Sequence, residues 1–271
     1  MDSVKSYFKN KFENITFSED GTVKIYSTVD QENNSVQYGV GIYNRSESAV
    51  IKLSGKDVLN FLQRITTNDV SKLEPFHYVS TLFTNEKGRL IDRTALIKFE
   101  DNYFLVGSKF NDAVLARWID RYIITEDVKI ENYTNKFLIL DIIGPQAESY
   151  LTLICGKDVD ELTDNKLHKV FIEGTPAHLL KKKALSGESL YWLVSEIENS
   201  EILLDYLLSH KSVFDLEMIG EDSFDRYRVI NKVLKFGKEI SDNYNPHEAN
   251  LLDDVSFKKG CYIGQEVIAR L

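Results

Sequence analysis

The sequence predicts a mixed α+β fold made of two similar lobes, and two observations support this class. Runs rich in β-branched and aromatic residues alternate with amphipathic stretches at helical spacing. In addition, the order β-α-β-β-α occurs twice, with a strand–glycine–helix junction at Gly55 and again at Gly144, which is 144 − 55 = 89 residues later. We therefore expect a first lobe over residues 1–135 and a second lobe over residues 136–271, packed together as one body.

The first half is expected to hold two helices and a series of strands. Ser54 precedes apolar residues at helical spacing, so a helix should follow it, and Asn111 opens a second stretch of this kind. Residues 85–88 end in Gly88, which can adopt positive φ and close a hairpin. The expected strands are residues 22–27, 37–43, 49–53, 78–84, 90–99, 103–108 and 128–132.

The second half is expected to hold three helices between and after its strands. Pro145 suits the first turn of a helix that follows Gly144. Ser200 opens the next helix, and a third is expected over residues 222–232. The expected strands are residues 136–142, 170–173, 177–185 and 191–195.

Composition places the chain among ordinary globular proteins. It has 271 residues, of which 43% are hydrophobic and 28% are charged, and this excludes an intrinsically disordered protein. Its two cysteines, Cys155 and Cys261, cannot build a disulfide framework, and the sequence has no CxxC pair to bind zinc. Disulfide-rich secreted proteins and zinc modules are therefore excluded.

Charge and hydropathy restrict the partners. The 33 Lys and Arg residues against 42 Asp and Glu residues give a net charge of −9, which repels phosphate backbones. The first residues lack the apolar segment of a signal peptide, and no apolar run of the sequence is long enough to cross a bilayer. We expect a cytoplasmic monomer that binds neither nucleic acid nor membranes.

A segment near the C-terminal end has the composition of a reactive or ligand-binding turn. Gly260 and Gly264 flank Cys261, so the backbone there can adopt positive φ and approach a ligand closely. Lys259 could lower the pKa of the thiol if the two side chains meet. The alternative is that Cys261 is a small apolar residue buried in a tight turn. The other residues of this motif are Tyr262, Gln265 and Glu266.

The whole motif reads Lys-Gly-Cys-Tyr-Ile-Gly-Gln-Glu over residues 259–266 and resembles the signature of the YgfZ family of folate-binding proteins. That family is related to the T-protein, the aminomethyltransferase of the glycine cleavage system. The resemblance implies two lobes around a central cavity that holds tetrahydrofolate or a folate derivative. It also implies that the C-terminal β-barrel of the relatives is largely absent from this chain. Supporting similarity covers residues 55–63, 67–70, 81–92, 228–240 and 246–249.

The same resemblance assigns single residues to the folate site. Asp92 matches the first carboxylate of an Asp-Asp pair in the T-protein, whereas Arg93 replaces the second. Ser108 stands where the T-protein has an asparagine, and Glu188 matches a glutamate whose carboxylate holds the pterin. Arg228 matches an arginine and would meet an anionic or polar part of the folate.

The departures from the T-protein pattern bear on the chemistry. An arginine beside Asp92 would depress the pKa of this carboxyl and weaken it as a base. Ile230 also replaces a glutamate. We therefore do not expect methylene transfer of the T-protein type. The leading hypothesis is a folate-binding protein in iron–sulfur cluster assembly or repair, with client or assembly proteins as partners, Cys261 as the functional thiol and Lys259 tuning its charge.

Two alternatives stay open at this point. The chain could be a folate-dependent aminomethyltransferase of the glycine cleavage type, or a non-catalytic interaction protein with a relic cavity. The sequence has no cluster of metal ligands, and one thiol cannot hold an iron–sulfur cluster, so no resident metal is expected.

Several further side chains allow both a functional and a structural interpretation. His247 and Glu248 could titrate in a cleft, or they could be exposed or cap a turn. The lysines at 181–183 could meet the carboxylates of a folate tail, or they could form a solvated strand edge. Trp118 and Trp192 could stack on a pterin or pack in the core.

Overall fold

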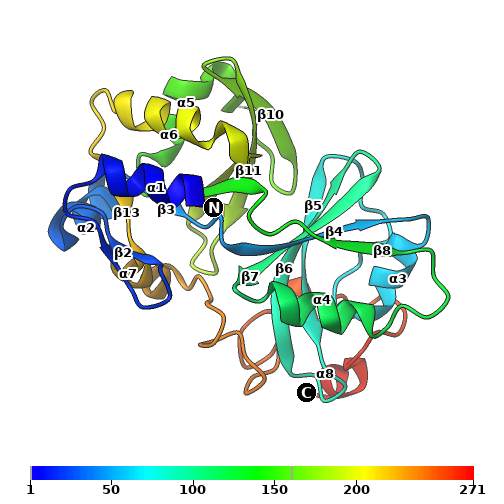
Figure 1. The fold of residues 1–271 in the computed structure, drawn as a ribbon. Coiled ribbons are helices and arrows are strands. Elements are labelled where there is room, and N and C mark those ends of the chain that lie inside the picture. The colour runs from blue at the N-terminus through cyan, green and yellow to red at the C-terminus, as the bar shows by residue number, and fades with distance from the viewer. Residues whose placement is uncertain (1, 160) are drawn as a thin grey trace. The chain divides into compact units, whose positions relative to one another are not determined.

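Two sheets organise the chain, and each gathers strands that are distant in sequence. In the computed structural model, which describes residues 2–159 and 161–271, a six-stranded sheet has the order β10-β11-β12-β9-β3-β13 (Figure 1). A five-stranded sheet has the order β5-β6-β7-β4-β8, and β1 (Thr16–Phe17) pairs with β2 (Val23–Ile25). The predicted α+β class is confirmed.

The chain divides into two compact units, and neither is continuous in sequence. Unit 1 comprises residues 1–46 and 135–233, and unit 2 comprises residues 47–134 and 234–271. Compared with the lobes expected at 1–135 and 136–271, residues 1–46 group with the second half and residues 234–271 with the first. The pairing of β3 with both β9 and β13 joins the N-terminal segment to unit 1. The lobes expected from the sequence and a cavity between them stay a prediction.

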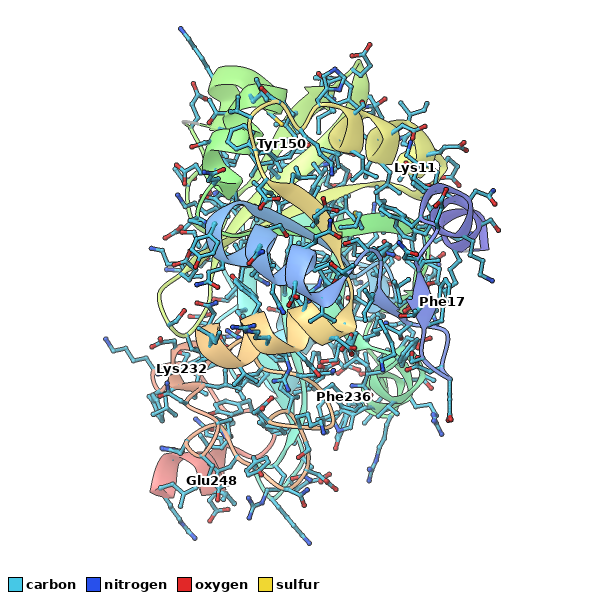
Figure 2. All side chains as sticks on the ribbon, turned by 90° about the vertical axis from the view of Figure 1, so that its left-hand side faces the viewer. Lys11, Phe17, Tyr150, Lys232, Phe236 and Glu248 are labelled. Carbon is cyan, nitrogen blue, oxygen red and sulfur yellow. The ribbon has the colours of Figure 1, made fainter. Side chains whose placement is uncertain are left out.

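Unit 1 packs helices against one face of the six-stranded sheet. Figure 1 shows α1, α5 and α6 gathered beside this sheet, and their apolar side chains share one core with it. Tyr150 of α5 donates its hydroxyl to the Leu207 carbonyl of α6 at 2.7 Å, so its side chain lies between the two helices (Figure 2). The elements of unit 1 outside the β1–β2 pair are α1 (Asp2–Lys11), α2 (Val29–Tyr38), β3 (Val40–Asn44), β9 (Phe137–Ile143), α5 (Ala147–Cys155), η1 (Gly156–Val159), β10 (Leu167–Ile172), β11 (Thr175–Lys183), β12 (Ser189–Glu196), η2 (Ile197–Asn199), α6 (Ser200–Ser209), β13 (Leu216–Ile219) and α7 (Glu221–Asn231).

Unit 2 builds its own core between the five-stranded sheet and two helices. Phe61 and Leu62 of α3 and Leu115 of α4 pack with Phe83 and Leu96 of the sheet. The C-terminal segment completes this unit with a short helix. The elements of unit 2 are β4 (Ser48–Ser54), α3 (Val58–Ile65), β5 (His77–Thr84), β6 (Leu90–Phe99), β7 (Asn102–Lys109), α4 (Asp112–Asp120), β8 (Lys129–Asn132), η3 (Leu252–Asp254) and α8 (Gln265–Arg270).

The strand–glycine–helix junction occurs at both predicted positions. Gly55 connects β4 to α3 with φ 121°, and Gly144 connects β9 to α5 with φ 103°. A Cβ at Gly55 would lie 2.0 Å from the Asp127 carbonyl oxygen, and one at Gly144 would lie 2.6 Å from the Gly39 carbonyl oxygen. Only glycine combines this backbone conformation with so close an approach.

One predicted element is wrong at its start. Residues 37 and 38 belong to helix α2 and not to the strand expected over 37–43. Thr28 caps this helix by accepting a hydrogen bond from the Gln31 amide at 3.2 Å, and the helix ends at Gly39. The short β-like pattern at 37–43 is therefore only the end of a helix followed by β3.

Candidate functional site

Asp92 is a fully buried carboxylate held by four hydrogen bonds. Its exposed fraction is 0%. It accepts from the Ser108 hydroxyl at 2.6 Å, the Ser108 amide at 3.1 Å, the Asn111 side-chain amide at 3.0 Å and the Arg93 amide at 2.8 Å. Burial raises the pKa of Asp92, and these hydrogen bonds oppose the rise. The structure thus brings two predicted site residues, Asp92 and Ser108, into direct contact.

The expected effect of Arg93 on Asp92 is wrong. Burial raises the pKa of Asp92. Arg93 opposes this rise through its backbone amide and not through its guanidinium. Neighbouring side chains of a strand point to opposite faces, so Arg93 is directed away from Asp92. Its Nε donates to Asp254 Oδ2 at 2.7 Å. Asp254 was not singled out from the sequence, because nothing local links residues 161 positions apart.

The Arg93–Asp254 pair belongs to a network that ties the C-terminal segment to the sheet of unit 2. The Thr67 hydroxyl donates to the Asp254 carbonyl oxygen at 2.6 Å and accepts from the Leu82 amide at 3.0 Å. The Asn68 amide meets the Thr81 hydroxyl at 3.0 Å. The turn after α3 therefore connects β5 with η3.

Lys259 is anchored in the same region. Its side chain is 8% exposed, and its ammonium donates to the carbonyl oxygens of Thr66 at 2.8 Å and Asn68 at 2.6 Å. Burial lowers the pKa of Lys259 to about 8, and the negative charge of Asp69 opposes this. The ammonium is thus committed to backbone carbonyls, and the predicted tuning of Cys261 by Lys259 stays a prediction.

Cys261 is exposed on a turn whose ends are fixed. On one side Lys259 is anchored as described. On the other, Gly264 has φ 82°, and a Cβ there would lie 2.6 Å from the Asn85 carbonyl oxygen of the β5–β6 hairpin. The Thr84 hydroxyl donates to the Ile263 carbonyl at 2.8 Å. The alternative of a buried apolar cysteine is therefore wrong, because the thiol is presented to solvent.

His247 and Glu248 have structural contacts. His247 Nε2 lies 2.8 Å from the Ile268 carbonyl oxygen of α8. Glu248, labelled in Figure 2, pairs with Arg89 at 2.9 Å and accepts from the Asn245 amide at 2.8 Å. These contacts fold the segment before the motif against the hairpin and α8.

Glu188 and Arg228 are both in unit 1. Glu188 is exposed in the turn between β11 and β12. The Ser186 amide of that turn donates to the Asn231 carbonyl at the end of α7 at 3.2 Å, which brings the turn to the helix that carries Arg228. Arg228 is 6% exposed and its Nε meets Asp225 Oδ1 at 2.6 Å.

The three lysines at 181–183 contact either carboxylates or an aromatic ring. Lys181 pairs with Glu148 at 3.2 Å and Lys183 with Asp164 at 2.9 Å. Lys182 lies between them in sequence and stacks on Trp192, with Nζ 3.6 Å from the ring centre.

Trp118 makes an edge contact with Phe83, with ring centres 5.2 Å apart, as expected of a core residue.

Within the described part of the chain, two kinds of feature were not found. No group of three or more His, Cys, Asp or Glu side chains in residues 2–159 and 161–271 could hold a metal ion. No helix in those residues is long and apolar enough to cross a membrane.

The family is decided by a comparison of the whole sequence with known families. The family described as the GCVT N-terminal domain matches residues 5–259. The chain belongs to the GCVT N-terminal domain family. The match ends at Lys259, so it includes the anchor of the motif and stops before Cys261.

Two relatives of this GCVT N-terminal domain chain carry the same name. This chain is 28% identical over 247 residues to an aminomethyltransferase of Caldanaerobacter subterraneus, and the alignment covers 90% of this chain and 66% of the relative. It is 28% identical over 246 residues to an aminomethyltransferase of Bacillus cytotoxicus, covering 90% and 67%. The chain thus spans about two thirds of the length of these relatives.

A solved structure shows the same fold. The glycine cleavage system aminomethyltransferase T from Bartonella henselae superposes with a TM-score of 0.82 at 17% identity, covering 98% of this chain and 72% of that one. At this identity the similarity concerns the fold alone.

One polar group of this GCVT N-terminal domain was missed by sequence reasoning. Asp141 of β9 is 2% exposed and lies 3.3 Å from Arg45 Nε, and Arg45 lies over Trp192 at 4.7 Å from the ring centre. The signal was available, because Asp141 is the one charged residue within the apolar run 137–143. A charge inside a buried strand needs a partner or a function.

Proposed function

We propose that this chain binds tetrahydrofolate and transfers a one-carbon unit to it in the manner of the aminomethyltransferases. The observation that carries the proposal is the 28% identity, over 90% of the chain, to proteins named aminomethyltransferase. Membership of the GCVT N-terminal domain family and the matching fold support it. Tetrahydrofolate is the carbon acceptor that such a reaction requires.

The site residues receive different roles under this proposal. Asp92 positions Ser108 and the strand pair that carries Arg93, because its oxygens are all used by protein donors. Asp254 is the carboxylate fixed by Arg93, and it is the candidate for handling a reacting amine. Glu188 is exposed and free to accept hydrogen bonds from the paired N–H groups of a pterin.

The activity is tested by supplying the purified protein with an aminomethyl-lipoyl donor and tetrahydrofolate and measuring ammonia. We expect ammonia release that depends on folate and that falls in Asp254→Asn. A protein that binds tetrahydrofolate but releases no ammonia above a folate-free control would contradict the transfer activity.

A second candidate function is the YgfZ-type role in iron–sulfur cluster assembly or repair, with iron–sulfur client proteins as partners. The observation that favours it is the exposed thiol of Cys261 on a turn with fixed ends. The replacement of a T-protein carboxylate by Arg93 also favours it.

This second function is tested in cells that lack the gene. Cys261→Ala should leave folding and folate binding intact but fail to restore the activity of iron–sulfur enzymes. Full restoration by Cys261→Ala would remove the thiol from the function. Cys155→Ala is the matched control, because this cysteine is half-buried at the end of α5.

A further inference from the structure

The C-terminal end of helix α7 is closed by a turn from another part of unit 1. The helix ends at Asn231, and Lys232, labelled in Figure 2, follows with φ 56°. The last carbonyl groups of a helix have no partner within it. The carbonyl oxygen of Asn231 instead accepts from the amide of Ser186, 45 residues earlier, at 3.2 Å. The turn between β11 and β12 therefore caps α7.

The side chain of Asn231 makes a second contact with the same turn. Its Nδ2 donates to the Tyr227 carbonyl oxygen at 3.2 Å, and its Oδ1 accepts from the Ser186 hydroxyl at 3.3 Å. These contacts use opposite sides of the amide group, so together they determine its orientation. One residue thus holds Ser186 both by its amide and by its hydroxyl.

Ser186 passes this restraint on to Glu188. Its Oγ accepts from the Glu188 amide at 3.2 Å. The turn is closed by the Ala184 amide, which donates to the Glu188 carbonyl oxygen at 2.9 Å. Gly187, with φ 92°, lies between Ser186 and Glu188, and glycine adopts many backbone conformations. A contact from outside the turn is therefore needed to select one of them.

The other end of α7 is fixed by a buried carboxylate. Glu32 is 0% exposed and accepts from the Gly220 amide at 2.9 Å and from the Tyr26 amide at 2.6 Å. Gly220 precedes α7, and a Cβ there would lie 1.9 Å from the Lys24 carbonyl oxygen of β2. The start of the helix is therefore held against β2. A side chain on an element that is fixed in this way is positioned more precisely than one on a loop.

The charge of Glu188 acts on the same helix. Burial raises the pKa of Tyr227, and the charges of Asp141 and Glu188 add to the rise. Tyr227 precedes Asn231 by one helical turn. The exposed carboxylate of Glu188 is thus held close to α7.

We propose that Asn231 is a positioning residue for tetrahydrofolate: acting through Ser186, it fixes the turn that carries Glu188. The role of Glu188 as a ligand contact rests on the proposed function. A turn that is fixed before the ligand arrives loses less conformational entropy on binding, so the affinity is higher. The amide of Asn231 contacts Ser186 and Tyr227, so this role requires no contact between Asn231 and the ligand.

The test measures the affinity of the full chain for tetrahydrofolate by calorimetry. Asn231→Ala should weaken binding about three- to tenfold, which is the factor expected for one hydrogen bond between neutral groups. Ser186→Ala should weaken it to a similar extent, whereas Ser186→Thr keeps the hydroxyl and should bind as the wild type does. Val229→Ala is the matched control on α7, because this side chain is 64% exposed, and its affinity should be unchanged.

A double-mutant cycle separates positioning from a merely structural role. Glu188→Ala should weaken binding about tenfold to a hundredfold, because it removes a charged acceptor. In that variant, a further Asn231→Ala substitution should not change the affinity, because the contact that Asn231 positions is already absent. Equal weakening by Asn231→Ala with and without Glu188 would overturn the proposal, since the effect would not pass through Glu188.

The outcomes distinguish this inference from the proposed function. If the folded wild type binds no tetrahydrofolate, the proposed function fails and this inference falls with it. If the wild type binds and Glu188→Ala weakens binding, but Asn231→Ala and Ser186→Ala do not, only this inference is overturned. If Glu188→Ala leaves the affinity unchanged, Glu188 is not the contact, and this inference is overturned while folate binding stands.

Discussion

Replacing Lys259 by methionine should alter how the stability of the protein depends on pH. The ammonium is 8% exposed, and burial lowers the pKa of Lys259 from its ordinary value of 10.5 to about 8. Methionine keeps an apolar stem of similar length but cannot titrate. The comparison therefore isolates the proton of one side chain.

The sign follows from proton binding in the two states. Between the two pKa values the unfolded chain holds a proton on Lys259 that the folded protein has released. Stability rises with pH wherever the unfolded state binds more protons. With a folded pKa of about 8 and an unfolded pKa of 10.5, this residue contributes a rise of about 2 kcal/mol between about pH 7.5 and about pH 9.5.

Urea unfolding of the wild type and Lys259→Met at these two pH values measures this rise. The wild type should gain about 2 kcal/mol more than the variant. Several tyrosines with raised pKa values, such as Tyr262, lower stability as pH approaches their range, but they are present in both proteins and cancel. Lys258→Met, which alters an exposed neighbour, should behave as the wild type. If the free energy of unfolding changed equally with pH in the wild type and in Lys259→Met, the two carbonyl hydrogen bonds would offset the effect of burial on the pKa of Lys259. That result would refute the reasoning.

Three further predictions concern the segment around the motif. Gly264→Ala should destabilise the protein by about 1–3 kcal/mol in urea unfolding, because the φ of 82° at Gly264 and the carbonyl oxygen of the hairpin exclude a Cβ. Gly260→Ala is the control, and it should change the free energy of unfolding by less than about 0.5 kcal/mol because the space around Gly260 is open. Equal effects of the two substitutions would contradict the packing described. Arg93→Met should lower the free energy of unfolding by about 1–3 kcal/mol, because it leaves the Asp254 carboxylate, 7% exposed, without its charged partner. Arg93→Lys should lower it less, because it keeps the positive charge. If Arg93→Met left the free energy of unfolding unchanged, the ion pair would not be needed for stability. Cys261 is exposed and should be alkylated rapidly in the folded protein. Mass spectrometry should therefore find one fast-reacting thiol, and this thiol should be missing in Cys261→Ala. A fast-reacting thiol that persists in that variant would contradict the assignment.

The parts of the fold that the sequence predicts are those determined by local rules. The junctions at Gly55 and Gly144 need a positive φ that only glycine adopts easily, and both were found where expected. Helices at 200 and 222 and the hairpin around Gly88 follow from spacing and turn residues in the same way. The division into units does not, because the pairing of β3 with β9 and β13 joins segments that are distant in sequence and leaves no local pattern.

The candidate site shows the same limit. Alternation along a strand is enough to place Asp92 and Arg93 on opposite faces, so the expected effect of one on the other could have been excluded from sequence. The partner of Arg93 could not be found in that way, because Asp254 is brought to it by the return of the C-terminal segment. The anchor of Lys259 on Thr66 and Asn68 is long-range for the same reason.

The two buried aspartates show why the number of donors decides a role better than a matched motif does. Asp92 and Asp141 both lie on central strands, and burial raises the pKa of both. Asp92 receives four hydrogen bonds from its own unit, so it has no capacity left for a ligand in this conformation. Asp141 faces Arg45 at 3.3 Å, and the charges of Arg45 and Lys182 and the Trp192 side chain oppose the rise of its pKa. A resemblance selects Asp92 as a ligand-binding residue because its sequence position matches, whereas its four protein donors give it a structural role. Removal of the Asp92 carboxylate should therefore leave several buried donors unpaired and reduce the stability of the fold.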